Sequence, residues 1–149
     1  MKLFEVASYS KLKAGIIPFK SDGRGMFMVS SDAKYGGIRP AIAKGRVDEG
    51  ENSETAAVRE GEGELGLKKS NFKGTPFLVW SGKLTGLDAS YPFDVYAVEV
   101  EDPNDFGEFH YETAKTLWMS AAEFTTDGRQ SQNAIVQDAF KIIEKRLNR

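Results

Sequence analysis

Helical periodicity lies in the middle of this chain, while the segments on both sides of it have the pattern of strands. From about Ser53, small or apolar residues recur with the spacing of one helix face, at Ala57, Val58, Gly61 and Leu65. Such a helix must bury this face against another element, because it cannot form a core alone. The pattern therefore favours a layered α+β fold in which helices pack on a sheet.

Strand-like runs supply the sheet. They are Leu12–Lys20, Met26–Ser31, Arg39–Lys44, Thr75–Ser81, Phe93–Val100 and Thr116–Met119. Turn residues at Ser21–Gly25 predict a hairpin between the first two runs. Pro18 predicts that the first run is an edge strand or ends near the proline, because proline cannot donate to a ladder. We expect a turn at Gly82–Tyr91 and a polar loop at Asp102–Tyr111.

Two further helices are predicted near the C-terminus. Ser120 and Glu123 match the capping box and should open a short helix. The segment from about Ser131 to Leu147 is amphipathic, as expected of a longer helix that packs on the sheet. We find no linker, repeat or low-complexity tract, so residues 1–149 are expected to form a single domain.

The composition excludes several classes of site. With no cysteine and only His110, the chain has no disulfide, thiolate zinc site, cysteine nucleophile or multi-histidine metal cluster. Its 22 acidic and 20 basic residues favour a hard ion on carboxylates, such as Mg²⁺ or Mn²⁺, if a metal is bound. The net charge of -2 argues against a broad nucleic-acid surface. Since neither a membrane helix nor a signal peptide is apparent, a cytoplasmic protein is expected.

The segment Gly45–Leu67, GRVDEGENSETAAVREGEGELGL, contains the strongest chemical signal. In a helix Glu60 and Glu64 lie four residues apart on one face, where their repulsion costs a few tenths of a kcal/mol. A cation between them would turn this repulsion into binding. Arg59 can pair with Glu51 through two hydrogen bonds and so hold the preceding loop against the helix.

This segment resembles the signature of the Nudix hydrolases: Gly, five residues, Glu, seven residues, Arg-Glu, an aliphatic, any residue, Glu-Glu, any residue, Gly, an aliphatic. The matching positions are seven of the nine specified: Gly45, Glu51, Arg59, Glu60, Glu64, Gly66 and Leu67. The resemblance implies an α/β/α sandwich with a mixed sheet between helices. It also implies divalent-metal-dependent hydrolysis of a pyrophosphate bond in a nucleoside diphosphate linked to another moiety.

Two positions depart from the signature. Gly61 replaces the aliphatic residue on the face assigned to the sheet, where a small residue allows close packing. Gly63 replaces the first Glu of the Glu-Glu pair. Glu62 is no substitute, because it lies about 200° around the helix from Glu60 and Glu64. Gly63 therefore predicts either a reduced set of metal-binding carboxylates or weakened catalysis.

The resemblance assigns roles to the matching residues. Glu60, Glu64 and the Gly45 carbonyl would bind Mg²⁺ or Mn²⁺, while Arg59 and Glu51 would fix the loop to the helix. The general base of the family varies in position. One candidate here is Glu60. The favoured one is Glu112, which lies in a late loop near Glu108 and His110 and is also a candidate extra metal ligand.

The remaining candidates would bind the substrate. The cations near the cleft that are suited to phosphates are Lys13, Arg39, Lys44 and Arg46. The aromatic side chains suited to stack a base are Phe4, Tyr35, Tyr91 and Trp118. Subfamily markers for ADP-ribose and for diadenosine polyphosphates are replaced by Gly82, Lys83 and Leu84, so the substrate stays open.

Other functions compete with this hypothesis. Gly61–Gly66 fits the dinucleotide fingerprint G-x-G-x-x-G, but a helical segment precedes it and its glutamates would repel a pyrophosphate. A catalytically weakened nucleotide-binding module on the same fold is the main alternative, because of Gly63. An RNA 5′-pyrophosphohydrolase is a third, and the sequence leaves homodimerisation open.

Overall fold

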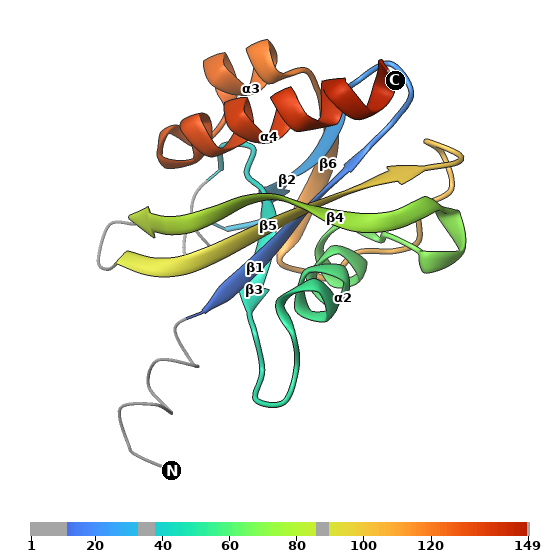
Figure 1. The fold of residues 1–149 in the computed structure, drawn as a ribbon. Coiled ribbons are helices and arrows are strands. Elements are labelled where there is room, and N and C mark those ends of the chain that lie inside the picture. The colour runs from blue at the N-terminus through green and yellow to red at the C-terminus, as the bar shows by residue number, and fades with distance from the viewer. Residues whose placement is uncertain (1–11, 33–37, 86–89, 149) are drawn as a thin grey trace.

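The computed structural model describes residues 12–32, 38–85 and 90–148. A six-stranded sheet lies between two layers of helix, with α2 (Ser53–Leu65) on one face. The helices α3 (Ala121–Asp127) and α4 (Asn133–Leu147) cover the other face (Figure 1). This arrangement confirms the predicted α+β sandwich.

The sheet is mixed, and its central strand receives partners on both edges. The strands are β1 (Lys13–Phe19), β2 (Gly25–Ser30), β3 (Ala43–Arg46), β4 (Phe72–Thr85), β5 (Ser90–Val100) and β6 (Thr113–Met119). Their order is β4-β5-β1-β2-β6, and β3 pairs with β1 off this path. β1 runs parallel to β5 and antiparallel to β2 and β3. β3 takes the first half of one β1 edge, whereas β2 joins that strand only at Phe19↔Gly25.

The position of β1 corrects one of the two expectations drawn from Pro18. β1 is an interior strand, so the prediction of an edge strand is wrong. Pro18 is the second-last residue of β1 and lies opposite Val98 of the parallel neighbour. The alternative, that the strand ends near the proline, is therefore confirmed, and a missing N–H is tolerated there.

β3 lies further along the chain than predicted. The sequence pattern placed it at Arg39–Lys44, whereas it spans Ala43–Arg46. Ala41 forms only an isolated bridge with Met28, and the preceding Pro40 cannot donate a hydrogen bond. Gly45 is thus part of a strand.

The last three strands, β4, β5 and β6, extend beyond their predicted bounds. The strand predicted at Thr75–Ser81 extends to Thr85, and the one predicted from Phe93 begins at Ser90. Most of the expected turn at Gly82–Tyr91 is therefore strand, because pairs such as Leu84↔Tyr91 continue the ladder. Residues 86–89 lie outside the described part of the chain. β6 begins at Thr113, three residues before its predicted start.

The helix α2 packs closely on the sheet, as predicted from its small residues. Ala57, Val58, Gly61 and Leu65 are all buried. A Cβ at Gly61 would lie 2.7 Å from Ile16 Cγ2 and 2.9 Å from Leu67 Cδ2. The glycine thus lets the helix approach β1 more closely than a larger residue would.

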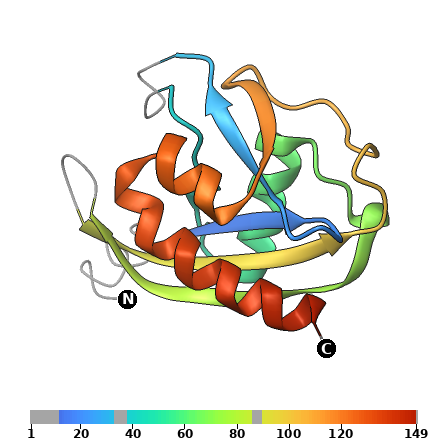
Figure 2. The same cartoon turned by 90° about the horizontal axis from the view of Figure 1, so that it is seen from above.

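The C-terminal helices cover the opposite face of the sheet (Figure 2). Ser120 and Glu123 form the predicted capping box at the start of α3. α4 follows a 3-10 turn at Gln130–Gln132 and buries Ile135, Val136, Ala139, Phe140 and Ile143. No helix in the described ranges is both long enough and apolar enough to cross a bilayer.

Candidate active site

Arg59 joins the acidic loop to α2. Its Nε and Nη2 atoms donate to Glu51 Oε2 and Oε1 at 3.0 and 2.9 Å, the fork geometry of a strong Arg–carboxylate pair. Nη2 also donates to the Arg46 carbonyl at 2.9 Å. The hydrogen bonds from Arg59 lower the pKa of Glu51, and those to Glu51 raise the pKa of Arg59. The structure thus brings the predicted pair together.

Glu60 lies against β3, and the space it occupies depends on Gly45. Arg59 Nη1 donates to Glu60 Oε1 at 2.9 Å. A Cβ at Gly45 would overlap the carboxyl carbon and Oε1 of Glu60 and would lie 2.6 Å from Oε2. A glycine is therefore needed at this strand position to admit the carboxylate.

Glu64 meets the edge of β3 one helical turn after Glu60. Its Oε1 accepts a hydrogen bond from the Lys44 backbone N–H at 3.0 Å. Burial, and after it the negative charge of Glu60, raises the pKa of Glu64 to about 8. Burial, and after it the positive charge of Lys13, lowers the pKa of the Lys44 ammonium to about 8. Both charged forms are thus disfavoured here.

The pairing of β3 decides which backbone carbonyl faces these carboxylates. Val47 N–H donates to the Leu12 carbonyl at 3.0 Å. Because hydrogen-bonded pairs alternate along an antiparallel ladder, the peptide groups of Gly45 face β1. The Lys44 N–H instead points to Glu64, and the Lys44 carbonyl lies on the same side of the strand. The carbonyl on the Glu64 side of β3 therefore belongs to Lys44, whereas the sequence-based prediction named Gly45.

The loop before β6 is tied to the C-terminal end of α2. The last carbonyls of a helix lack partners within it. Here they accept hydrogen bonds of 2.7 to 2.9 Å from the loop. The Gly66 carbonyl accepts from Gly107 N–H, the Gly63 carbonyl from His110 N–H, and the Glu64 carbonyl from the Thr113 hydroxyl. The Glu112 carbonyl accepts from Ser31 N–H at 2.8 Å. After burial and Glu60, the charge of Glu112 also raises the pKa of Glu64, so these carboxylates lie near one another.

His110 covers the helix position at which the signature has its missing glutamate. A Cβ at Gly63 would lie 2.8 Å from His110 Cε1 and 3.0 Å from Nδ1. The ring is held there because the His110 N–H donates to the Gly63 carbonyl at 2.7 Å. Glu62 is exposed, as the helix geometry predicted. The departure at Gly63 is thus matched by an imidazole packed on the helix backbone.

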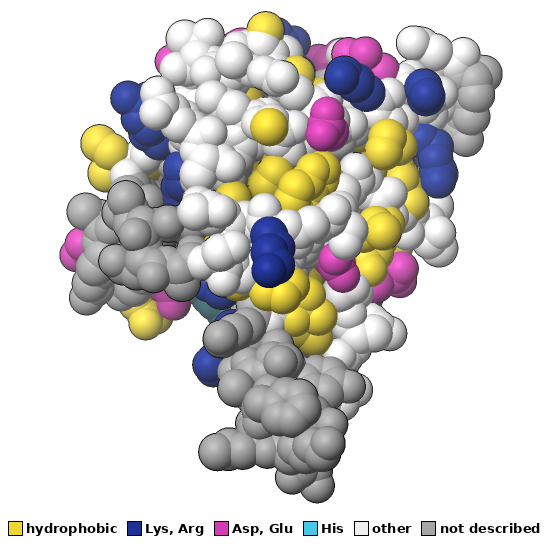
Figure 3. Space-filling view, turned by 60° about the vertical axis from the view of Figure 1, so that its left-hand side comes forward, with side chains coloured by type: hydrophobic (Ala, Val, Ile, Leu, Met, Phe, Trp, Pro, Cys, Tyr) yellow, Lys and Arg dark blue, Asp and Glu magenta, His cyan; other side chains and the backbone are white. Residues whose placement is uncertain are grey.

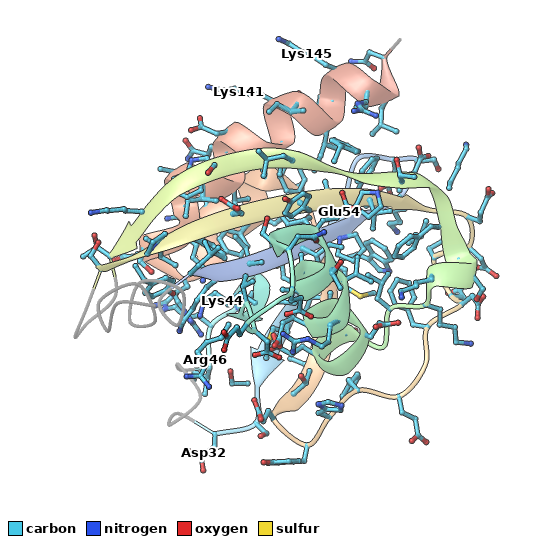
Figure 4. The ribbon with its side chains drawn as sticks, turned by 60° about the horizontal axis from the view of Figure 1, so that its bottom comes forward. Asp32, Lys44, Arg46, Glu54, Lys141 and Lys145 are labelled. Atoms are coloured by element: carbon cyan, nitrogen blue, oxygen red, sulfur yellow. The ribbon has the colours of Figure 1, made fainter. Side chains whose placement is uncertain are left out.

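The predicted substrate-binding cations lie in different places. Lys44 is half-buried at the end of the carboxylate cluster, and Figure 4 shows it beside Arg46 on the β3 side of α2. The Arg46 side chain is exposed. Arg39 is also exposed, and its Nη1 donates to the carbonyl of Asp127, the last residue of α3, at 3.4 Å. Of these three, Lys44 contacts the carboxylates most directly.

The predicted aromatic residues are divided in the same way. Phe4 and Tyr35 lie outside the described residues. Trp118 packs edge-to-face on Phe106 with ring centroids 5.9 Å apart, on the α2 side of the sheet. Tyr91 lies beside two of the predicted phosphate-binding cations, with Lys13 Nζ 4.4 Å and Lys44 Nζ 5.8 Å from its ring centroid.

Arg129 was not predicted, and it approaches this region from the turn after α3. Its backbone N–H donates to the Pro40 carbonyl at 2.9 Å. Burial lowers the pKa of its guanidinium, and the charges of Tyr91 and Glu64 act on it in the opposite direction. No periodicity or motif marks this residue, because only long-range folding brings it to the site.

The oxygen donors at this site are of the type that a hard divalent ion prefers, but there are few of them. Across the described ranges, no three His, Cys, Asp or Glu side chains are arranged to enclose an ion. Glu60, Glu64 and a β3 carbonyl supply oxygen donors, and Gly45 leaves the space for them. Mg²⁺ is commonly held by one or two carboxylates, with water and substrate phosphates completing its shell. The residues therefore fit an ion that the substrate helps to bind.

Comparison with known proteins gives the same fold. C. elegans Ap4A hydrolase, in a binary complex, superposes with TM-score 0.72 and 14% identity, over 90% of this chain and 98% of that chain. RenU, a Nudix hydrolase from M. Smegmatis, superposes with TM-score 0.71 and 16% identity, over 91% and 87%. MutT protein from Methanosarcina mazei Go1 gives 0.67 and 12%, over 90% and 94%.

These identities are low enough to show the fold alone, and no curated protein sequence matches the chain. The family follows from the sequence pattern as a whole. The family model described as the NUDIX domain matches residues 10–139, which include the entire signature segment. The chain therefore belongs to the Nudix hydrolase family.

Proposed function

We propose that this protein hydrolyses a phosphoanhydride bridge in a nucleotide-type substrate with the help of Mg²⁺ or Mn²⁺ at Glu60 and Glu64. The observation that carries the proposal is the half-buried Glu64 beside a second carboxylate, at a strand edge shaped by Gly45. Two neighbouring carboxylates removed from water are unfavourable unless a proton or a cation neutralises them. A divalent ion at this place would remove the repulsion and attract a phosphate chain.

The proposed reaction breaks the bridging P–O bond by attack of water. The water oxygen forms a new bond to phosphorus, the bridging oxygen leaves with the electron pair, and a carboxylate accepts the proton. A bound divalent ion would supply phosphate neutralisation and a lower pKa for water. Arg59 would keep Glu60 in position, since its Nη1 holds one carboxylate oxygen while Nε and Nη2 grip Glu51.

Glu112 is the better candidate for the proton acceptor. One oxygen of Glu60 already accepts a hydrogen bond from Arg59 at 2.9 Å, so it is not free to accept a proton from the attacking water. Glu112 lies near Glu64, on a loop that hydrogen bonds secure to α2 and to β2. Glu112→Gln should lower kcat with little change in Mn²⁺ affinity if Glu112 is the base. Loss of Mn²⁺ affinity would make it a ligand instead.

The substrate class is proposed as a small nucleotide. On the face drawn in Figure 3, the described Lys and Arg side chains are scattered among white and yellow areas. The net charge of -2 likewise favours a small substrate over nucleic acid. One structural neighbour is the C. elegans Ap4A hydrolase, which makes dinucleoside polyphosphates one class to test here.

A nucleotide panel with purified protein tests the proposal. The panel contains ADP-ribose, FAD, NADH, dinucleoside polyphosphates, nucleotide sugars and nucleoside triphosphates, each with Mg²⁺, Mn²⁺ or chelator. We expect release of phosphate or a nucleoside monophosphate from at least one class, only with metal, and one ¹⁸O atom from labelled water in a product. Tight binding without turnover for every compound would instead show a non-catalytic binding module, the alternative motivated by Gly63.

A further inference from the structure

Three cationic side chains converge beside the carboxylates of Glu60 and Glu64. They are Lys13 at the start of β1, Lys44 on β3 and Arg129 after α3. In the described part of the chain, none of the three side chains forms an ion pair. The Nζ atoms of Lys13 and Lys44 lie 4.4 and 5.8 Å from the ring centroid of Tyr91. Consistent with this proximity, the positive charges of Lys13 and Arg129 act, after burial, to lower the pKa of Lys44.

The strand register explains how the first two cations meet. Lys44 lies opposite Gly15 in the β1–β3 pair, and Lys13 precedes Gly15 by two residues, so both side chains project from one face of the sheet. That face also carries Tyr91, two residues before the buried Phe93 on β5. It is the face covered by α3 and α4, opposite α2. Lys44 thus contacts Glu64 through its backbone and this cluster through its side chain.

Arg129 completes the cluster from the helical layer. Its Nε atom is buried and lacks a hydrogen-bond partner among the residues that the structure describes. A buried donor of a charged group is unfavourable without an acceptor, so an unpaired one calls for a ligand or water. Tyr91 and Glu64 both act against burial on the Arg129 pKa, so the guanidinium lies within electrostatic range of the aromatic ring and of Glu64.

We propose that Arg129, Lys13 and Lys44 form a subsite around Tyr91 for a phosphate group of the substrate that lies beyond the hydrolysed bridge. The ligand class rests on the proposed function, whereas the anion subsite itself rests on the geometry of this cluster. Charge-assisted donors from an Arg and two Lys side chains match phosphate oxygens. A chain of three or more phosphates would reach both this subsite and Glu60, so such compounds should bind better than diphosphate-linked ones.

Binding of inorganic triphosphate and inorganic pyrophosphate, measured by calorimetry with chelator present, tests the subsite without any turnover. Wild-type protein should bind triphosphate at least about tenfold more tightly than pyrophosphate. Arg129→Gln should weaken triphosphate binding about tenfold or more, since charge-assisted hydrogen bonds contribute about 1.5–3 kcal/mol each. Arg129→Lys should restore part of this loss, and Lys13→Gln should weaken binding severalfold.

Lys141→Gln is the matched control for the loss of one positive charge. Lys141 is exposed on α4, far from Lys44 in Figure 4. It should bind triphosphate as the wild type does, and the thermal unfolding of each variant reports whether it folds. If Arg129→Gln fails to fold, Lys13→Gln carries the test.

Unchanged affinity in the folded Arg129→Gln and Lys13→Gln variants would overturn the proposal, as would an equal loss in Lys141→Gln. If wild-type protein bound triphosphate and pyrophosphate equally tightly, the subsite would not bind a phosphate group beyond the hydrolysed bridge. Failure of every compound in the nucleotide panel would instead count against hydrolysis and leave this binding result intact.

Discussion

The two ends of the charged face of α2 are built differently. Around Arg59, each charge meets a partner: Glu51 receives two hydrogen bonds from Arg59, Glu60 receives one, and Asp48 lies 3.5 Å from Nη2. One turn later, the Glu64 carboxylate accepts a hydrogen bond only from the Lys44 backbone N–H within the described residues, and burial raises the pKa of Glu64 to about 8. The nearby Lys44 has its pKa lowered to about 8 by burial and by Lys13.

This difference separates a part of the site that is complete in itself from a part that needs a ligand. The Arg59 end is stabilised by its own hydrogen bonds and fixes the loop whether or not substrate is present. The Glu64 end holds charges that burial disfavours, so a proton, a cation or a phosphate must stabilise it. The chemistry should therefore depend on the Glu64 end, and the predictions below test that division.

The largest effect is expected from Glu64→Gln. This change removes a carboxylate but keeps an oxygen that can accept the Lys44 N–H. We predict a loss of metal-dependent hydrolysis of about a hundredfold or more, because charge stabilisation by metal contributes several kcal/mol. The assay uses the best substrate from the nucleotide panel.

Glu62→Gln is the control for this variant. Glu62 is exposed on the opposite side of the same helix and should have wild-type rates. Full activity of Glu64→Gln with an unchanged metal requirement would assign the reaction to another part of the molecule.

Gly45→Ala should have the next largest effect, because the new Cβ overlaps the Glu60 carboxylate. We predict that Glu60 moves away from β3, with a loss of stability of about 1–3 kcal/mol and a fall in activity of more than tenfold. Urea denaturation and the hydrolysis assay measure the two effects. Gly107→Ala is a matched control, since its Cβ would lie 3.5 Å from Lys68 Cε in ordinary contact. Equal behaviour of both variants would contradict the close approach.

The pH dependence of stability should reflect two opposing titrations at the Glu64 end, those of Glu64 and Lys44. For Glu64 the pKa rises from 4.5 in the unfolded chain to about 8 in the folded one, so the folded state binds more protons between these values. The free energy of unfolding of the metal-free protein should therefore fall as pH rises from about 4.5 to 8. Above pH 8 the effect of Lys44 has the opposite sign, because its pKa is about 8 in the folded state and 10.5 in the unfolded chain. The unfolded chain then binds more protons, so the free energy of unfolding should rise between about pH 8 and 10.5.

Glu64→Gln should flatten the fall between pH 4.5 and 8 and leave the recovery above pH 8. Urea unfolding of both proteins in chelator across this range provides the measurement. Parallel curves for wild type and variant would show that burial of Glu64 has no energetic consequence.

The smallest effect is expected from Gly63→Glu, which restores the residue that the signature specifies. The helix gains up to about 1 kcal/mol of propensity, but the new Cβ displaces the His110 ring. We predict that the change is about 0.5–1 kcal/mol more favourable in a His110→Ala background than in the wild type. A double-mutant cycle by urea denaturation measures this coupling. A coupling near zero would mean that the ring does not restrict position 63.

Local sequence patterns could predict the Arg59 end and most of α2. Glu60 and Glu64 share a face because their separation is one helical turn, and the capping box opens α3 as its residues require. The α+β architecture followed from the order of periodic segments. In each case the deciding interactions lie within about a dozen residues of sequence.

The Glu64 end depends on contacts between distant segments, and this explains what the sequence did not reveal. Arg129 comes from a turn without periodicity, and β3 is displaced because its pairing with β1 outweighs the apolar pattern around Pro40. The same pairing turns the Gly45 carbonyl toward β1 and exposes that of Lys44. The edge-strand prediction from Pro18 was wrong for the same reason, because the sequence does not reveal which strands pair with β1.

Mn²⁺ binding followed by electron paramagnetic resonance tests most directly whether the Glu64 end holds the ion. The signal of free Mn²⁺ decreases as the ion binds, so the measurement needs neither a substrate nor turnover. Wild-type protein and Glu62→Gln should deplete the free signal equally, whereas Glu64→Gln should bind Mn²⁺ at least about tenfold more weakly. Equal depletion by all three proteins would contradict the assignment of the ion to Glu64.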